Sequence, residues 1–492
     1  MANWSLIPRF FSNTVSSFLK KRILSGEALL FCVFVLAQIL VNTNKLYLLL
    51  IVFYAIGLYL ISRNALKTAW FTFISLLLFQ QAKYFIETIS IPTSQSYVNI
   101  PVLYNIMFSD IALLFVLFFI WRGRASAVIN KKVGSVELLF IPIIIVGLIS
   151  TWLSYFPNIS LFYLIQIVRY FVIFIISGII LNDKNIKKIS FEILFLFVLF
   201  NGTLICLQAL RGGPFGLPIE HLNSWSQLGR FAVEQTDIYR PGGTFDDPNL
   251  AASVIGMIFP ILLAVGLARS IFNRSFVWIT LAAAAMGLLF TGSRAVWLIS
   301  VLVCFFGIYM CKRLYKKIRL PILPSPRNIL YVILISSIVL PFIMLRLSTL
   351  SSTFTDTGSG TYRLKHLEIA TNYLLSFPFG IGLNVFEYLT PMRYEAKDYV
   401  YQIAEPHNIF AQIGSELGIF GLLLFCYVFS RIISHKYKIV LVNKKPLSIG
   451  ILLGCISYLG IACFYPWFLY SPLSEIFWLF MGAELYGTKN VS

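Results

Sequence analysis

The sequence has little charge for its length. Only 12% of its 492 residues are Asp, Glu, Lys or Arg, whereas 58% are hydrophobic and 16% aromatic. So few charges could not cover the surface of the several soluble domains that the length alone would suggest. Apolar runs of roughly 17 to 25 residues recur instead, which is the length a helix needs to cross the hydrocarbon core of a bilayer. The composition therefore predicts an integral membrane protein.

Acidic residues and cysteines are also scarce. There are 20 Asp and Glu against 39 Lys and Arg, so the formal net charge is +19. This excess is expected from membrane topology and from attraction to anionic lipids, and nucleic-acid binding is not expected. The seven cysteines all lie in or at the ends of apolar runs. A disulfide framework or a thiolate metal site is therefore not expected.

The apolar runs predict an all-α polytopic fold with about 14 transmembrane helices. We place these spans near residues 27–41, 46–62, 69–89, 104–121, 137–153, 160–181, 190–210, 248–267, 275–291, 294–311, 328–345, 408–430, 447–464 and 472–487.

Lys and Arg indicate the orientation. With a cytoplasmic N-terminus, most of them fall in cytoplasmic connections, as the positive-inside rule requires, and both termini are then cytoplasmic. Three long polar segments lie outside, of which 346–406 is the longest. The resulting division is a bundle of seven spans (1–210), an external loop (211–247), spans 8 to 11 (248–345), a large and partly helical external loop (346–407) and three last spans (408–492).

The first candidate site segment runs from Arg240 to Asn249. Asp247 can cap the following helix while Pro248 occupies its first position, where a missing N–H costs nothing. An outward helix N-terminus beside the Arg240 guanidinium is suited to an anion. Without an anion, the same residues simply make a well-capped helix start.

Two further arginines stand out. Arg294 follows the short turn Thr291-Gly292-Ser293, where it either snorkels to headgroups or binds an anion at the interface. Arg169 lies near the middle of its span, where a charge is expensive and normally faces a partner or a wet cavity. Glu416, roughly 13 Å into its own helix, is the expected partner. The pair is either structural or lines a substrate path.

The large external loop contains a predicted helix. Residues Thr361 to Leu374 have helical periodicity, with Arg363 and His366 on one side, and an amphipathic helix lying on the membrane surface is the alternative. Pro378-Phe379-Gly380-Ile381-Gly382 ends this helix. The aromatic segment Phe386 to Tyr401 is suited to stacking on sugars or to anchoring at the interface. It is where we expect acceptor choice to be encoded.

His407 and Asn408 close the loop just before a helix, and Gly418-Ile419-Phe420-Gly421 follows nine residues later. This spacing resembles the signature of the O-antigen ligase family (WaaL) and its wider ligase/polymerase superfamily. Arg240 with Pro248-Asn249, the turn before Arg294, and Arg363 leading to Pro378–Gly382 match in the same order. Asp246 and Asp247 depart from the pattern, so no catalytic role is transferred to them. The number of spans is closer to that of Wzy-type polymerases than to that of the ligases.

The resemblance implies a GT-C-like glycosyltransferase of the bacterial cytoplasmic (inner) membrane. It implies an inverting, metal-independent reaction on the outer face, with no cofactor. A glycan linked to undecaprenyl diphosphate would move to an acceptor hydroxyl on a glycan or lipid-glycan, as in lipopolysaccharide biosynthesis. Membrane lipids are the remaining expected partner.

Under this reading the leaving diphosphate is bound by Arg240, Arg294 and Arg363 through charge-assisted hydrogen bonds. His407 either takes the acceptor proton or holds the diphosphate. The predicted catalytic residues are therefore His407, Arg294 and Arg240. Asn408, like Arg169 and Glu416, is assigned to a substrate path or to structure.

Three alternatives stay open at this point. Asp246, Asp247 and Glu405 are outward-facing acids that could hold a divalent ion. A Wzy-type polymerase of lipid-linked repeat units would use the same apparatus. A lipid-linked glycan flippase or other transporter would explain charges inside the membrane, although repeated halves are missing and the polar signal lies on one membrane face.

Overall fold

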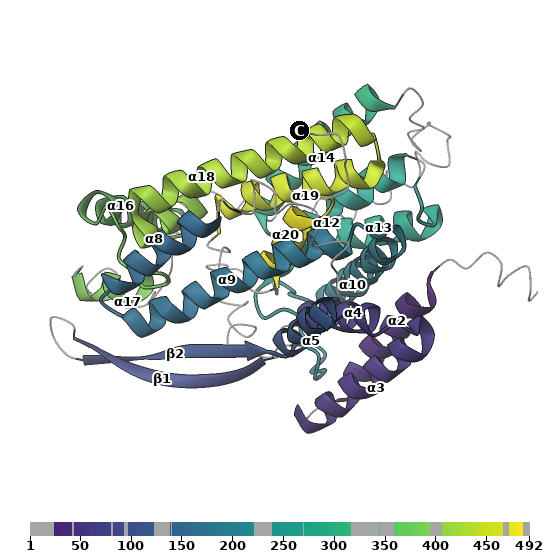
Figure 1. The fold of residues 1–492 in the computed structure, drawn as a ribbon, viewed down its shortest axis with the longest axis horizontal. Coiled ribbons are helices and arrows are strands. Elements are labelled where there is room, and N and C mark those ends of the chain that lie inside the picture. Colours follow the sequence, from purple (N-terminus) through teal and green to yellow (C-terminus); the bar gives the residue numbers. More distant parts are fainter. Residues whose placement is uncertain are drawn as a thin grey trace, which may run out of the picture.

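The computed structural model describes residues 24–41, 44–79, 82–92, 97–122, 138, 140–220, 239–268, 270–315, 344, 359–393, 406–465 and 472–485. Its elements in chain order (Figure 1) are α2 (Gly26–Gln38), α3 (Asn44–Ser62), α4 (Ala65–Leu77), β1 (Ala82–Pro92), β2 (Tyr97–Met107), α5 (Phe108–Arg122), α8 (Phe140–Trp152), α9 (Pro157–Ile180), α10 (Lys184–Arg211), α12 (Pro248–Leu267), α13 (Arg274–Thr291), α14 (Arg294–Leu314), α16 (Ser359–Ser376), α17 (Phe386–Arg393), α18 (Ile409–Asn443), α19 (Pro446–Ala462) and α20 (Leu473–Gly482).

Seven of the helices in these ranges are long and apolar enough to cross a membrane, namely α3, α9, α10, α12, α13, α14 and α18. Five shorter apolar helices accompany them: α2, α4, α8, α19 and α20. A polytopic membrane protein is therefore supported. The count of about 14 spans stays a prediction, since the span expected at 328–345 lies, apart from residue 344, outside the described residues.

The predicted all-α fold is confirmed only in part: the structure is mostly helical but also contains a β-hairpin. The span expected at 69–89 ends as α4 at Leu77, and the antiparallel hairpin β1–β2 follows, paired from Ala82 with Met107 to Pro92 with Tyr97. The hairpin also occupies the beginning of the span expected at 104–121, because α5 starts only at Phe108. Its sequence is rich in Ile, Val, Tyr and Thr, which favour strands. Hydropathy alone does not distinguish such a run from a helix.

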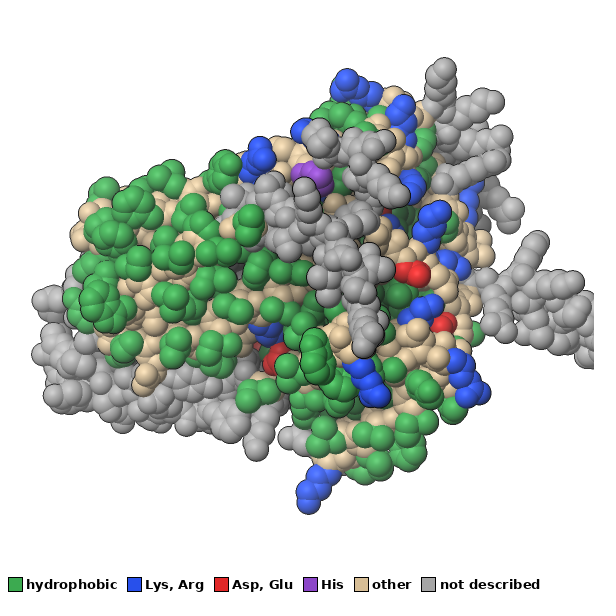
Figure 2. All heavy atoms as spheres, viewed as in Figure 1, with side chains coloured by type: hydrophobic (Ala, Val, Ile, Leu, Met, Phe, Trp, Pro, Cys, Tyr) green, Lys and Arg blue, Asp and Glu red, His purple; other side chains and the backbone are tan. Residues whose placement is uncertain are grey.

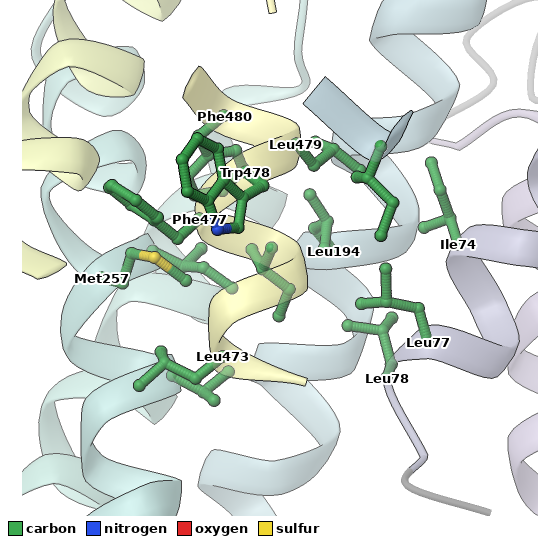
Figure 3. Close-up of a cluster of buried hydrophobic side chains, with 14 of the residues drawn as sticks. Ile74, Leu77, Leu78, Leu194, Met257, Leu473, Phe477, Trp478, Leu479 and Phe480 are labelled. Atoms are coloured by element: carbon green, nitrogen blue, oxygen red, sulfur yellow. The ribbon is translucent and has the colours of Figure 1, made fainter. Parts of the chain in front are cut away.

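Helix α20 lies at the centre of the bundle. Its residues from Leu473 to Gly482 are all buried, and Figure 3 shows Phe477 and Trp478 packed near Met257 of α12. Helix α12 is almost as enclosed: 89% of an apolar 18-residue stretch within it is buried, compared with 33% for α14. Large apolar side chains remain exposed on α14, as expected where a helix faces lipid. Figure 2 shows hydrophobic side chains covering the side of the molecule over α8, α9 and α18.

Helix α18 is a helical hairpin, which corrects the single span predicted at 408–430. Gly418 has φ 72° and ψ −173°, and this break divides α18 into a first arm (409–417) and a second arm (419–443). The rings of Phe410 and Phe425 lie 6.3 Å apart, and a Cβ on Gly414 would lie 3.5 Å from the side chain of Leu422. In a straight helix 15 residues rise about 22 Å. The first arm therefore folds back along the second.

The segment Pro378–Gly382 is bound to this reversal. Ile381 N donates to Ser415 O (3.0 Å), Gly382 N to Glu416 O (3.2 Å) and Ile419 N to Pro378 O (3.1 Å). A Cβ on Gly418 would lie 2.0 Å from Pro378 O. Close approach of two backbones thus explains why glycines recur in both motifs.

Candidate functional site

Arg240 is held between the first turn of α12 and the end of α13. Its Nε donates to Thr291 O (2.9 Å) and its Nη2 to Asn249 Oδ1 (2.7 Å), and only 7% of the residue is exposed. Asp247 caps α12 as predicted, accepting from Asn249 N at 2.6 Å. Burial lowers the pKa of Arg240 and raises that of Asp247. Since both acceptors of Arg240 are uncharged, these hydrogen bonds orient its positive charge without neutralising it.

The loop that carries Arg240 is fixed on α10. Gln208 exchanges two hydrogen bonds with the backbone of Gly243 (2.9 and 3.0 Å), and Asn201 Oδ1 accepts from Thr244 N (3.0 Å). Both polar side chains are buried. Neither Asn201 nor Gln208 was predicted from the sequence. Their separation of seven residues, which places both on one face of an otherwise apolar helix, was the available signal.

Tyr465, which sequence reasoning also missed, connects the turn before α14 to this loop. Its hydroxyl donates to Asn249 Oδ1 (3.1 Å) and lies 2.9 Å from the hydroxyl of Ser293. Arg294 interacts electrostatically with Tyr465, Arg240 and Arg363. The α13–α14 turn predicted at Thr291–Arg294 is present, with Gly292 in the left-handed conformation that ends α13. The turn thereby brings Arg294 beside Arg240.

Arg363 reaches the same place from α16. Its Cζ lies 5.3 Å from the centroid of the Tyr465 ring, a cation–π geometry. Arg240, Arg294 and Arg363 come from three separate parts of the chain, and each pair of them interacts electrostatically. We call these three residues the arginine cluster.

His407 lies beside the arginine cluster at the start of the first arm of α18. Its ring centroid is 6.3 Å from that of His366, and Arg363 acts on it electrostatically. Burial, with additional repulsion from Arg363 and His366, lowers the pKa of His407 to about 3. His407 is therefore neutral near pH 7, with one ring nitrogen able to accept a proton.

Asn408 has a structural position. Its Oδ1 accepts from Phe410 N (2.9 Å) and Ala411 N (3.1 Å), which caps the first arm of α18, and its Nδ2 donates to Cys463 O (3.1 Å) at the end of α19. Asn408, and not His407, therefore caps the first arm of α18.

Arg169 is not paired with Glu416, contrary to the prediction. It forms ion pairs with Asp110 and Glu475, donates to Gln166 Oε1 (3.0 Å) and donates to Ser109 Oγ (3.2 Å). These partners join α5, α9 and α20. The residue is therefore part of an ionic network inside the bundle.

Glu416 lies elsewhere because α18 reverses at Gly418. Its backbone carbonyl accepts from Ser150 Oγ (2.5 Å) near the α8–α9 turn, and its carboxylate accepts from the backbone N–H groups of Asn384 and Phe386. The depth estimate assumed one straight helix running into the membrane. With the first arm folded back, Glu416 instead anchors the segment that leads into α17.

The aromatic segment is only partly available for stacking on a sugar. Phe386 is fully buried and Tyr388 is 4% exposed; Phe386 packs with Ile369 and Tyr373 of α16 in a small hydrophobic core. One face of α16 accordingly packs against the protein, while Leu364, Leu367 and Leu375 remain exposed, so the alternative of an amphipathic helix on the membrane surface stays open. Tyr394, Tyr399 and Tyr401 lie outside the described residues.

The acids proposed as metal ligands were Asp246, Asp247 and Glu405. Over the part of the chain that the structure describes, no group of three or more His, Cys, Asp and Glu side chains is arranged to hold a metal ion. Asp247 acts as a helix cap, and Glu405 lies outside the described ranges.

A comparison with protein families identifies the central part of the chain. A model described as O-antigen ligase matches residues 279–426, which include Arg294, Arg363, His407 and both glycine motifs. Arg240 precedes the matched range. A search of curated proteins found no match. The family match supports an enzyme with a ligase or polymerase role in polysaccharide biosynthesis, acting on lipid-linked glycans in a membrane. This match, together with the order of the motifs, supports the O-antigen ligase/polymerase superfamily for the matched part of the chain.

Proposed function

We propose that this protein is a GT-C-like glycosyltransferase that moves a glycan from undecaprenyl diphosphate to an acceptor hydroxyl on the outer face of the bacterial inner membrane. The observation that carries the proposal is the arginine cluster. Two like charges about 6 Å apart repel by roughly 3 kcal/mol at an effective dielectric constant near 20. Three such charges with one neighbouring carboxylate, Asp247, leave an excess of positive charge, which is costly to the fold unless a further anion offsets it.

A diphosphate is the anion that fits this arrangement best. Guanidinium groups bind phosphate oxygens through pairs of parallel hydrogen bonds, and a diphosphate presents several such oxygens. Arg240 uses Nε and Nη2 to bind the protein, which fixes its plane before a ligand arrives. Donors held in place in this way stabilise charge that develops on a leaving group. The cluster can supply this stabilisation without a metal.

The neutral state of His407 favours the role of general base over that of a diphosphate ligand. In this reaction the acceptor oxygen attacks the anomeric carbon while the bond from that carbon to the diphosphate oxygen breaks. His407 takes the hydroxyl proton, and the arginine cluster retains the lipid diphosphate. Attack from the face opposite the leaving group inverts the anomeric configuration. A bound diphosphate raises the pKa of His407, which assists proton uptake.

The direction of the helices supports a site on the outer face. Arg240 and Arg294 lie where α12 begins, α13 ends and α14 begins. The opposite ends of α13 and α14 carry Arg274, Lys312 and Arg313. By the positive-inside rule these basic ends are cytoplasmic, and the arginine cluster is then outside.

The test is glycosyl transfer by the purified protein in detergent, supplied with a lipid-diphosphate-linked glycan and an acceptor glycan. Product formed without a membrane to cross supports a transferase and contradicts a flippase. Arg294→Ala and His407→Ala should each lose at least about 100-fold in kcat/KM. Arg274→Ala, which removes an exposed arginine at the other end of α13, is the matched control.

The same assay separates ligase from polymerase. A ladder of products from the lipid-linked donor alone indicates a polymerase, whereas a reaction that requires a distinct acceptor indicates a ligase. Unchanged turnover in both Arg294→Ala and His407→Ala would show that the proposed site is wrong.

A further inference from the structure

A second histidine lies in the site and has no role in the reaction as described above. His366 follows Arg363 by one turn of α16 and is 1% exposed. Its ring centroid lies 6.2 Å from that of Phe386 at an interplanar angle of 87°, and 6.3 Å from that of His407 at 35°. The His366 ring is therefore placed between a hydrophobic core and the proposed base.

The electrostatic surroundings of His407 come from the same helix. Arg363 and His366 of α16 are the charged and titratable groups that act on His407 within the described part of the chain, and both oppose its protonation. Burial lowers the pKa of His366 as well. A bound diphosphate would raise the pKa of both rings, so that either can take a proton near neutral pH. Because two adjacent imidazolium ions repel, a proton on one ring disfavours a proton on the other.

We propose that His366 is a positioning residue for glycosyl transfer, which acts through His407 by fixing the orientation of its ring and opposing positive charge on it. This inference rests on the proposed function, in which His407 must be neutral when the acceptor binds. Arg363 also opposes positive charge on His407, and its effect is larger than that of His366, but its guanidinium lies against Tyr465, whereas the His366 ring lies beside the His407 ring. His366 also links the base to the buried contacts of Phe386 and Tyr373.

The competing explanation is that His366 only fills space beside Phe386. The two explanations differ in pH dependence. A space-filling residue can be replaced by Phe with little change in any protonation equilibrium. A positioning residue cannot, because removing His366 takes away a group that holds the pKa of His407 down.

The experiment compares wild type, His366→Phe and His366→Gln in the detergent assay between about pH 5 and pH 9, with kcat and KM measured separately. Tyr373→Phe is the matched control, since it lies two turns further along α16 and packs on the same Phe386 at 5.6 Å. Removing His366 should raise the pKa of His407 and move the acid limb of kcat to higher pH. We expect kcat at the acid end to fall about 3- to 10-fold with little change in KM.

A readout independent of turnover is histidine NMR of protein labelled on its four histidines. The His407 resonance, assigned from its loss in His407→Ala, should titrate at higher pH in His366→Gln than in wild type. Superimposable pH profiles and His407 titrations in wild type and folded His366→Gln would overturn the inference while leaving the proposed function intact. Absence of turnover in the wild type would overturn both.

Discussion

Two buried arginines of this protein, Arg169 and Arg240, differ in how their positive charge is compensated. Arg169 forms ion pairs with two carboxylates, Asp110 and Glu475. Arg240 is hydrogen-bonded to two neutral oxygens, and one carboxylate, Asp247, and two more arginines act on it electrostatically. Inside a membrane a charge needs a partner. The first site has its partners within the fold. The second has an excess of positive charge, which is the property expected of a site for an anionic substrate.

The largest effect is expected from breaking the first site. Arg169→Leu leaves Asp110 and Glu475 buried without their cation, and we expect a loss of about 3–5 kcal/mol in the free energy of unfolding. Thermal unfolding of the purified protein measures it. The triple variant that also carries Asp110→Asn and Glu475→Gln should recover part of the stability. If Arg169→Leu were as stable as wild type, the ionic network would not be structural.

Removing Arg240 from the second site should reduce activity much more than stability. Arg240→Ala is expected to lower kcat/KM for glycosyl transfer by about 100- to 1,000-fold, because it removes an oriented donor to the leaving group. Its thermal stability should fall less than that of Arg169→Leu, since relief of the like-charge repulsion offsets the loss of two hydrogen bonds and of the attraction to Asp247. A large loss of stability with normal turnover would assign Arg240 to structure, like Arg169.

A smaller effect on activity is expected from substituting Tyr465. Tyr465→Phe keeps the ring under Arg363 but removes the hydroxyl that contacts Asn249 and Ser293. Losing these hydrogen bonds is worth about 1 kcal/mol, so we expect roughly a fivefold lower kcat. Tyr465→Leu, which also removes the ring, should be worse. Equal activity of the two variants would argue against the cation–π contact.

The smallest expected effect is the response of the free enzyme to pH. Because the pKa of His407 is lowered to about 3, kcat/KM should change less than about threefold between pH 8 and pH 5 through this residue. A protonated His407 that bound diphosphate would instead make kcat/KM rise as the pH falls. The lowered pKa of His407 also makes the free energy of unfolding depend on pH. Its stabilising contribution is fully present above about pH 6.5 and declines as the pH falls toward 3.

Local sequence predicted much of what defines the candidate site. The cap Asp247, the turn before Arg294 and the helix around Arg363 are local features, and each is present where the residues predicted it. The order of the motifs was enough to predict the O-antigen ligase/polymerase superfamily, and the family match supports this prediction. That Arg240, Arg294, Arg363 and His407 act in catalysis stays a prediction.

The errors arose where a local signal was extended over a distance. Hydropathy treated the β1–β2 hairpin as parts of two spans, because strands rich in branched and aromatic residues are as apolar as helices. The segment 408–430 was likewise predicted as a single straight span. The reversal depends on Gly418 meeting Pro378, a contact between residues 40 positions apart.

The sequence by itself determined the class of protein, the positions of most helices and the identity of the residues that carry charge. Only the tertiary structure decided the partners of those charges: Asp110 and Glu475 for Arg169, Tyr465 for the arginine cluster, and His366 for His407. The physical reason is range. Apolarity and capping are set within a few residues, whereas the partner of a buried charge is chosen by how distant helices pack.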